Sequence, residues 1–446
     1  MGSDRHFLLN IGNSRTMAGK KLPLYSKILI GMFIGLVWGL SADSLGLLDF
    51  TRDWIKPFGD IFIRSLKLIA IPLVIVSLID GVSNLTDVAK LSRLGGKTIL
   101  FYLSTTVIAV TIGLVSVNLI KPGTFLSAER RDFFRNEYAS DIDMKVSGVG
   151  ESEGPLQILV DIVPENLFAS ISSNVNMLQV IFFAVLFGVA MILSPKEKVV
   201  TVKRFFDGAN HVILAIVDII MKYAPIGVFA LLASMNIDFE LIKTLGVYSL
   251  NVVLALALMA SIVYPSLLKL FTKVRYLTFF KGILPAQILA FSTSSSAATL
   301  PVTMKCAENN LGVSEEVSSF VLPLGATINM DGTSIHQGVS AVFIAQAFGI
   351  ALSMEQQLTI LMTAVLASIG TAAVPGAGII MLIIVLQSVG LDPAGLALIL
   401  AVDRPLDMLR TVVNITGDAV VACVVANSED KLDVAMANDP GTSISD

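Results

Sequence analysis

The stretch AGLALILAVDRPLDMLRTVVNITGDAVVACVVAN, residues 394–427, decides the fold class of this chain. It is long enough to cross a bilayer as a helix, which takes about 20 residues. It nevertheless contains five charged side chains. Because a charge at the centre of a membrane helix costs at least about 2.5–3.5 kcal/mol, so many charges cannot face lipid. The segment therefore predicts a membrane helix whose polar side looks into protein or a water-filled cavity.

The polar residues of this segment share one side of the predicted helix. At about 100° per residue, the arc that contains most of them is roughly 80° wide. Its members are Asp403, Asp407, Arg410, Asn414 and Asp418. Thr411 and Arg404 lie at the edge of the arc, and the opposite side is formed by Leu, Val, Ala and Met.

Two interpretations of this arc remain open. In the first, Asp403–Arg410 and Asp407–Arg410 form a buried ladder of ion pairs that pins helices together. Buried pairs often stabilise little after desolvation, which makes this a weak reason for so many polar groups. In the second, the arc binds a ligand with both signs of charge. Arg410 offers a planar fork for one carboxylate, Asp407 an acceptor for an ammonium group and Asn414 a donor for a second carboxylate, which describes an acidic amino acid.

The rest of the chain has the composition of a helical membrane protein. Of its 446 residues 54% are hydrophobic and 15% are charged, against about 25% charged in an average soluble domain. This hydrophobicity excludes a disordered chain, and the formal net charge of −4 leaves no broad basic surface for nucleic acid. Cys306 and Cys423 cannot build a disulfide framework or a CxxC metal site, and His6, His211 and His336 are too few for a histidine-rich one.

Six apolar segments that could span a bilayer occupy the first part of the chain. We expect them at about 23–48, 55–83, 94–120, 156–194, 207–235 and 241–271. Connections rich in Lys and Arg alternate with connections that are poor in them. Because the Lys- and Arg-rich connections of membrane proteins lie on the cytoplasmic side, this pattern predicts six spans with both ends inside. Residues 1–20 lack the apolar core of a signal peptide. The mixed charges of about 121–155 predict an aqueous loop.

The pattern changes after residue 275. Small and helix-breaking residues interrupt two apolar segments, 282–304 and 357–390. We expect a full-length, continuous helix after each of them, at about 315–350 and 394–427. Interrupted segments survive in a membrane only where protein or a water-filled cavity satisfies their backbone. Re-entrant segments in an inverted repeat, with a transporter site near the midplane, are one interpretation. Gly and Pro kinks in ordinary spanning helices are the other.

Asp331 lies in the motif NMDGT, in the middle of an apolar segment. Asp331, like Asp418, needs a counter-charge if it is buried in the membrane. A sodium ion could provide this charge, because a carboxylate, backbone carbonyls and hydroxyls such as that of Thr327 are hard oxygen ligands that suit Na⁺. Capping of a helix beside Gly332 is the alternative role for Asp331. The Ser/Thr run 292–296 offers hydroxyls and backbone N–H groups at a hairpin tip, or else small residues that allow close helix packing.

Together these motifs resemble the glutamate/aspartate transporter family, also called sodium:dicarboxylate symporters. The likeness covers nearly the whole chain from about residue 22 and runs through FSTSSSAATLPVTM (291–304), LPLGATINMDGT (322–333), ASIGTAAVPGAG (367–378) and DRPLDMLRTVVNITGD (403–418). It implies an all-α polytopic membrane protein with eight transmembrane helices, two re-entrant helical hairpins and inverted repeats. It also implies an elevator mechanism, a homotrimer, and multi-pass insertion in the cell inner (cytoplasmic) membrane with both termini cytoplasmic.

The resemblance also implies a division of the chain into a scaffold, which forms the trimer, and a moving transport domain. The scaffold consists of helices one, two, four and five and is expected at 22–92 and 156–240. The transport domain is expected at 93–155 and 241–427; it contains the loop 121–155 and the hairpins at about 278–309 and 355–390. Disordered or cytoplasmic tails are expected at 1–21 and 428–446.

Roles of single residues follow from the same resemblance. Arg410 would bind the side-chain carboxylate of the substrate, Asp407 its ammonium group, and Asn414 with Ser296 its α-carboxylate. Further substrate contacts are implied for Thr333, Thr411, Ser295, Arg404, Ala373 and Gly376.

The resemblance implies several sodium ions as cofactors, about three in a carrier of this kind. The first site would combine Asp418 with carbonyls of Gly325, Asn329 and Asn414. The second would use Asp331, Asn329, Tyr102, Thr105 and Thr106. The third would lie under the second hairpin, at Thr327, Met330, Ser368, Ile369 and Thr371.

The expected function is sodium-coupled symport of L-aspartate or L-glutamate. The alternatives within the family are a C4-dicarboxylate symporter and a neutral amino acid symporter. Members that carry C4-dicarboxylates lack the aspartate at position 407, and members that carry neutral amino acids lack the arginine at position 410, whereas this chain has both. Gln337 replaces a glutamate that is linked to proton coupling in animal members, and Asp418 also favours sodium. An ion channel needs a continuous lined pore. An intramembrane enzyme built on an Asp331–Asp418 dyad would lack a nucleophile and metal ligands.

Overall fold

The structure is a computed structural model that describes residues 24–42, 44–83, 92–132, 160, 163–172, 177–234, 239–369, 371, 373 and 376–438. Within these residues every regular element is a helix, apart from one bridge between Val313 and Leu432. Five helical stretches of the described chain are long and apolar enough to cross a membrane, at 48–83, 94–125, 196–234, 240–271 and 393–428. The prediction of a helical, multi-pass membrane protein is confirmed at this level.

The first half of the described chain contains seven α-helices and two short irregular turns. They are α1 (Leu24–Ser41), α2 (Leu48–Phe50), a π-helical turn (Thr51–Ile55), α3 (Lys56–Ser83), α5 (Ser92–Ile120), a 3₁₀ turn (Pro122–Phe125), α9 (Leu167–Ser172), α10 (Met177–Leu193) and α11 (Lys196–Ser234).

The second half contains ten further α-helices. They are α12 (Phe239–Leu258), continued by a π-helical turn (Met259–Val263) into α13 (Tyr264–Phe271), then α14 (Tyr276–Thr293), α15 (Ser296–Asn309), α16 (Glu315–Ile328), α17 (Asp331–Ala347), α18 (Met354–Ile369), α19 (Ala377–Ser388), a 3₁₀ turn (Pro393–Gly395), α20 (Leu396–Ser428) and α21 (Val434–Asn438).

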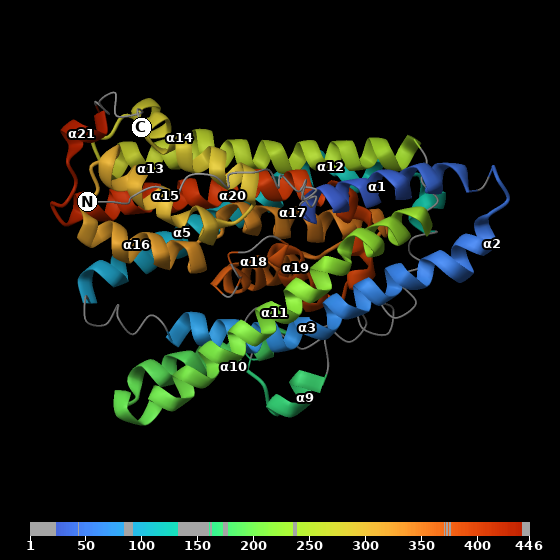
Figure 1. Cartoon of the computed structure of the whole chain (residues 1–446), viewed down its shortest axis with the longest axis horizontal. Helices are drawn as coiled ribbons and strands as arrows, with labels where there is room; N and C mark the ends of the chain where they lie inside the picture. Colours follow the sequence, from blue (N-terminus) through green and yellow to red (C-terminus); the bar gives the residue numbers. More distant parts are fainter. Residues whose placement is uncertain are drawn as a thin grey trace, which may run out of the picture.

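The long helices form two groups (Figure 1). One group consists of α1, α3, α10 and α11, in which α11 packs along both α1 and α3, and α10 packs on α3. The other group surrounds α20, which contacts α5, α12, α13, α14, α15, α16 and α17. Helices α18 and α19 lie between the groups, since they contact α3 and α10 on one side and α17 on the other.

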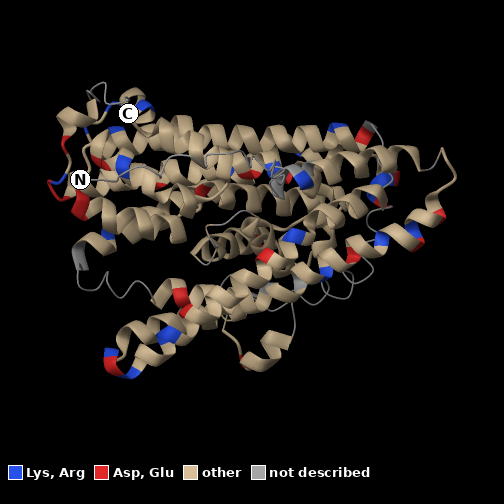
Figure 2. Cartoon of the chain, viewed as in Figure 1, with Lys and Arg blue, Asp and Glu red and all other residues tan. Residues whose placement is uncertain are grey.

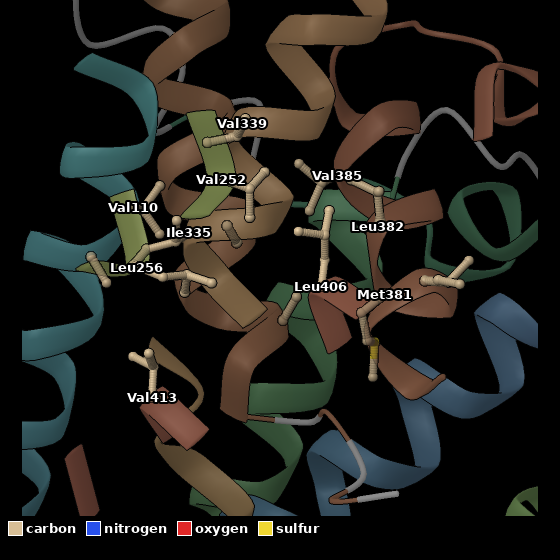
Figure 3. Close-up of a cluster of buried hydrophobic side chains, with 14 of the residues drawn as sticks. Val110, Val252, Leu256, Ile335, Val339, Met381, Leu382, Val385, Leu406 and Val413 are labelled. Atoms are coloured by element: carbon tan, nitrogen blue, oxygen red, sulfur yellow. The ribbon is translucent and has the colours of Figure 1, made fainter. Parts of the chain in front are cut away.

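Both groups bury some apolar side chains in the interior and expose others on the outside. In the second group α17 is buried along its whole length except at Gln346, and Figure 3 shows Val110, Val252 and Ile335 meeting in the core where α5, α12 and α17 converge. Large apolar side chains are exposed on the outside of both groups, for example Phe33 on α1 and Leu277 on α14. Figure 2 shows α12 without a charged residue beyond its first turns, as a helix in hydrocarbon requires.

The first interrupted segment folds as a helical hairpin. Helix α14 ends at Thr293, α15 begins at Ser296, and the two helices pack against each other, so the chain reverses and does not continue as one kinked helix. Ser294 makes the turn with a positive φ of 51°, a conformation that non-glycine residues rarely adopt. The second interrupted segment likewise reverses between α18 and α19, which contact each other.

The expectation of one uninterrupted segment over 315–350 is wrong. Helix α16 ends at Ile328 and α17 begins at Asp331, with Asn329 extended at φ −96° and ψ 98°. The break is stable because the side chain of Asn414 accepts hydrogen bonds from the backbone N–H groups of Gly332 (2.8 Å) and Thr333 (3.4 Å). These are N–H groups of the first turn of α17, which have no partner within the helix.

Two other predicted boundaries differ from the structure. The span at 207–235 is the end of a longer helix, because α11 starts at Lys196 with turns that are helical but charged. The segment 156–194 contains the separate helices α9 and α10. The expected tail 1–21 and most of the loop 121–155 lie outside the described residues, as does the end of the second tail from residue 439 onward.

Candidate functional site

The five polar residues of the arc on α20 are all enclosed by the protein. Their exposed fractions are 5% for Asp403, 8% for Asp407, 0% for Arg410, 4% for Asn414 and 2% for Asp418. The arc therefore looks into the second helix group and not into lipid, as its charges require.

A polar pocket of about 250 Å³, partly open to the outside, lies where both hairpin turns and the α16–α17 break meet α20. It is lined by Ser294, Ser296, Met330, Thr333, Thr371, Ala373, Gly378, Asp407, Thr411 and Asn414. Most of the lining side chains carry a hydroxyl, amide or carboxylate group, so the pocket suits a polar ligand. Among the lining residues, Gly378 is the one that the sequence did not suggest for any site, and Ser294 was suggested only as part of the Ser/Thr run 292–296.

The turns of the two hairpins touch each other at one side of the pocket. The hydroxyl of Ser295 donates to the carbonyl oxygen of Ala373 at 2.7 Å, and the backbone N–H of Ala297 donates to the same oxygen at 3.4 Å. Ser295 is thus engaged with the other hairpin and does not line the pocket. Two hydrogen bonds to one carbonyl hold the turns together and cover the space between them.

Arg410 lies behind the pocket wall with its guanidinium held by three side chains. Nη2 is 2.8 Å from Oδ1 of Asp407 and 3.0 Å from Oδ1 of Asp403, and Nη1 donates to Nδ1 of His336 at 2.6 Å. The ion pairs of the ladder interpretation are therefore present. A Cβ atom on Gly378 would be 3.8 Å from Nη1, so the guanidinium lies beside this glycine of the pocket wall.

The charges around Arg410 balance. Arg404 donates from Nη1 to Oδ2 of Asp407 at 3.1 Å, so two arginines face two carboxylates. Arg404 is not part of the pocket lining, and neither is Gly376. A balanced set of charges can accept a zwitterionic ligand without leaving a large uncompensated charge in the protein.

A second cluster of oxygen atoms lies below the α16–α17 break, around two carboxylates. Asp331 accepts from the hydroxyl of Thr106 (3.1 Å) and from that of Tyr264 (2.9 Å). Asp418 accepts from Nδ2 of Asn329 (2.9 Å), whose Oδ1 accepts from Thr105 (3.3 Å).

Both carboxylates of this cluster are buried without a cationic partner. Asp331 is 0% exposed and Asp418 is 2% exposed. Among the described residues, the ion pairs that we find involve neither of them. Because buried charges in proteins are paired or coordinate metal ions, the cluster has the chemistry of a site for a hard cation.

Two glycines allow the oxygen atoms of this cluster to come together. A Cβ atom on Gly417 would lie 2.6 Å from the hydroxyl of Tyr264 and 3.0 Å from both Asn329 Nδ2 and Asp331 Oδ2. A Cβ atom on Gly325 would overlap the hydroxyl of Tyr102 and lie 2.6 Å from Oδ1 of Asp418. Any larger residue at either position would separate the ligands.

The residues expected for the third sodium site are only partly brought together. The hydroxyl of Ser368 donates to the backbone carbonyl of Ile328 at 3.4 Å, and Met330 and Thr371 are buried nearby on the pocket wall. Thr327 is exposed and donates to Leu324 in its own helix at 2.9 Å. Ile369 is half-buried at the end of α18.

The sequence reasoning did not find Tyr264 and His336. Tyr264 follows a π-helical turn, and its reach to Asp331 from another helix leaves no trace in the sequence. His336 had a usable signal, because it lies one helical turn after Thr333 in a segment with hardly any other ionisable group.

Comparison with known proteins gives a consistent result. Residues 24–428 match the model of the sodium:dicarboxylate symporter family. The chain is 35% identical over 414 residues to the proton/sodium-glutamate symport protein of Geobacillus stearothermophilus, a match that covers 92% of this chain and 95% of that protein. It is 33% identical over 470 residues to excitatory amino acid transporter 2 of Rattus norvegicus, covering 93% and 80% of the two chains.

Proposed function

The chain belongs to the sodium:dicarboxylate symporter family, and from that premise we propose that it is a symporter that moves L-aspartate or L-glutamate across the membrane together with Na⁺. It is a membrane transporter and not an enzyme. The main support for an acidic amino acid as the substrate is that Arg410 and Asp407 lie together beside a small polar pocket. A carrier for neutral amino acids would not need the arginine, and a C4-dicarboxylate has no ammonium group for the aspartate.

In this proposal each charged group of the substrate meets a group of opposite charge or a hydrogen-bond donor. Arg410 binds the side-chain carboxylate, since a guanidinium can present two parallel N–H groups to it. Asp407 binds the ammonium group, while Asn414 and Ser296 bind the α-carboxylate. Thr333 and Thr411, both in the pocket lining, add hydroxyl contacts.

The remaining residues expected at the substrate site have supporting roles in this proposal. Ser295 and Ala373 close the hairpin turns over the substrate through their mutual hydrogen bond. Arg404 neutralises the second oxygen of Asp407. Gly376 begins α19 with a φ of 82°, a turn that glycine adopts without strain.

Sodium occupies the buried oxygen cluster in the same proposal. Asp418 with carbonyls of Gly325, Asn329 and Asn414 forms one site. Asp331 with Asn329, Tyr102, Thr105 and Thr106 forms a second. The third site combines Thr327, Met330, Ser368, Ile369 and Thr371. Because the side chain of Thr327 is exposed in this structure, the end of α16 and the second hairpin have to move together to complete this site.

Sodium and not the proton drives the proposed transport. One relative is named a proton/sodium-glutamate symport protein, so both ions have to be considered. The position of Gln337 supports sodium, since a fully buried amide cannot take up and release a proton as a carboxyl group can. The two buried carboxylates without a cationic partner support it as well.

The arrangement of the helices supports an elevator movement. We assign the group of α1, α3, α10 and α11 to a trimeric scaffold, expected at 22–92 and 156–240. We assign the group around α20 to a transport domain, expected at 93–155 and 241–427. The hairpins α14–α15 and α18–α19 belong to the transport domain, and α18 and α19 slide along α3. The proposed location is the cytoplasmic membrane, with eight spanning helices and both termini in the cytoplasm.

The test is uptake of radiolabelled aspartate and glutamate into proteoliposomes, with Na⁺, K⁺ and pH gradients imposed separately. An inward Na⁺ gradient is expected to drive uptake, replacement of Na⁺ by choline to stop it, and a pH gradient not to restore it. Uptake that persists in choline would refute sodium coupling. Uptake of succinate or of a neutral amino acid in place of aspartate would refute the substrate assignment. The K⁺ arm shows whether K⁺ is carried in return.

A further inference from the structure

His336 is an ionisable residue in direct contact with Arg410 that no role proposed so far uses. It lies on α17 and is 0% exposed. Its Nδ1 is 2.6 Å from Nη1 of Arg410 and its Nε2 is 3.6 Å from Oδ1 of Asp403. The ring centroid of Tyr248 on α12 lies 6.4 Å from that of the imidazole, with an angle of 64° between the ring planes. The hydroxyl of Tyr248 is hydrogen-bonded to Ser340 at 2.7 Å, so the polar contacts of the imidazole are with α20.

The contact fixes which imidazole nitrogen carries the proton. A guanidinium has only donors, so Nδ1 must be an acceptor without a hydrogen atom. A neutral imidazole then carries its proton on Nε2, which points toward Asp403. At 3.6 Å this is longer than a hydrogen bond, but the N–H dipole and the carboxylate attract each other and fix the plane of the ring.

The neutral charge of His336 is what makes it suitable as a partner of Arg410. Asp403 and Asp407 already balance Arg410 and Arg404. A third carboxylate in place of the imidazole would compete with the acidic group of a substrate, and a cationic side chain would repel the guanidinium. A neutral acceptor satisfies one N–H group of Arg410 and leaves its charge available.

We propose that His336 is a positioning residue for substrate recognition, in that its neutral imidazole holds the Arg410 guanidinium at the pocket wall beside Gly378 in the orientation that receives an acidic side chain. The proposal rests on the proposed aspartate/glutamate transport and identifies a residue on which its specificity depends. His336 does not touch the substrate and acts through Arg410 alone.

The proposal makes the acceptor at the Nδ1 position decisive, and amide variants can test it. The side-chain oxygen of Asn reaches nearly the position of Nδ1, whereas that of Gln extends toward the position of Nε2. We expect His336→Leu to raise the KM for aspartate by about tenfold or more, the factor that corresponds to a hydrogen bond to a charged group. His336→Asn should restore the KM to near the wild-type value, and His336→Gln should not.

A second measurement separates positioning from folding. Thermal stabilisation of each purified variant by Na⁺ alone reports on the oxygen cluster, and further stabilisation by aspartate reports on Arg410. His336→Leu should keep the first and lose most of the second. His211→Leu, at an exposed position of α11, is the matched histidine control and should change neither.

The outcomes distinguish this inference from the proposed function. A wild-type protein that takes up no acidic amino acid overturns the proposed function and this inference with it. Normal wild-type uptake with an unchanged aspartate KM in His336→Leu overturns the inference alone. If His336→Leu does not fold, the comparison of His336→Asn with His336→Gln decides, and an equal KM in these two variants overturns the inference.

Discussion

Substitution of Gly417 by alanine should damage sodium binding far more than a single methyl group suggests. The added Cβ atom would lie 2.6 Å from the Tyr264 hydroxyl and 3.0 Å from Asn329 Nδ2 and Asp331 Oδ2, so these groups must move apart. Overpacking of this kind costs about 1–3 kcal/mol. If the strain falls on the cation ligands, it weakens sodium binding roughly 5- to 150-fold.

The helix preference of alanine over glycine should by itself stabilise the variant, so it cannot account for a loss of sodium binding in Gly417→Ala. Alanine is better than glycine in a helix interior by about 0.5–1 kcal/mol. Gly246 on α12 provides the matched control, because a Cβ atom there would have no atom within 4 Å. Gly246→Ala should therefore be neutral or slightly stabilising, and any loss in Gly417→Ala reflects lack of space.

The assay is the Na⁺ concentration that gives half-maximal aspartate uptake in proteoliposomes, with Na⁺-dependent thermal stabilisation as a binding measurement. Gly417→Ala should raise the half-maximal concentration strongly, and Gly246→Ala should leave it unchanged. A folded Gly417→Ala protein with the sodium dependence of the wild type would refute the reasoning, because it would show that the cluster of Tyr264, Asn329 and Asp331 does not bind sodium.

Three further predictions concern single contacts. Arg410→Ala should abolish measurable aspartate binding, because it removes the guanidinium proposed to bind the substrate carboxylate and leaves Arg404 alone to balance Asp403 and Asp407; equilibrium binding with unchanged affinity would contradict it. Tyr264→Phe removes a donor to Asp331, and since a hydrogen bond to a charged group contributes about 1.5–3 kcal/mol, the half-maximal Na⁺ concentration should rise by roughly tenfold or more; equal sodium curves for variant and wild type would argue against it. Ser295→Ala removes the hydrogen bond to Ala373, which contributes about 0.5–1.5 kcal/mol net, so bound aspartate should dissociate several times faster; a dissociation rate equal to that of the wild type would show that this contact does not hold the hairpins closed.

The part of the fold that follows from the sequence is the part that local patterns control. The polar arc of α20 could be derived because helical geometry alone places Asp403, Arg410 and Asp418 on one side, and the cost of a charge in hydrocarbon turns that side inward. The turn at Ser294 was indicated by the run of small hydroxyl residues, which interrupts an otherwise apolar segment.

The rest depends on contacts between distant segments. The break after Ile328 is stabilised by Asn414, more than 80 residues away in sequence, so the long apolar segment 315–350 by itself predicted a continuous helix. The role of Tyr264 depends on how a π-helical turn orients α13 toward Asp331. The orientation of the Arg410 side chain toward His336 is likewise set by tertiary packing.

The side chain of Asn414 connects the two parts of the site in a way that constrains the energetics of the transport cycle. Its oxygen accepts from two N–H groups at the start of α17, and its nitrogen donates to Thr333 at 3.2 Å, so it links the proposed cargo pocket directly to the first turn of α17, which contains Asp331. In the proposed transporter, a displacement caused by the metal ion would reach the organic ligand through this amide, and the reverse would hold equally. Thermodynamic reciprocity then requires that the factor by which each ligand tightens the other be identical, so the dependence of aspartate affinity on Na⁺ and that of Na⁺ affinity on aspartate have to agree.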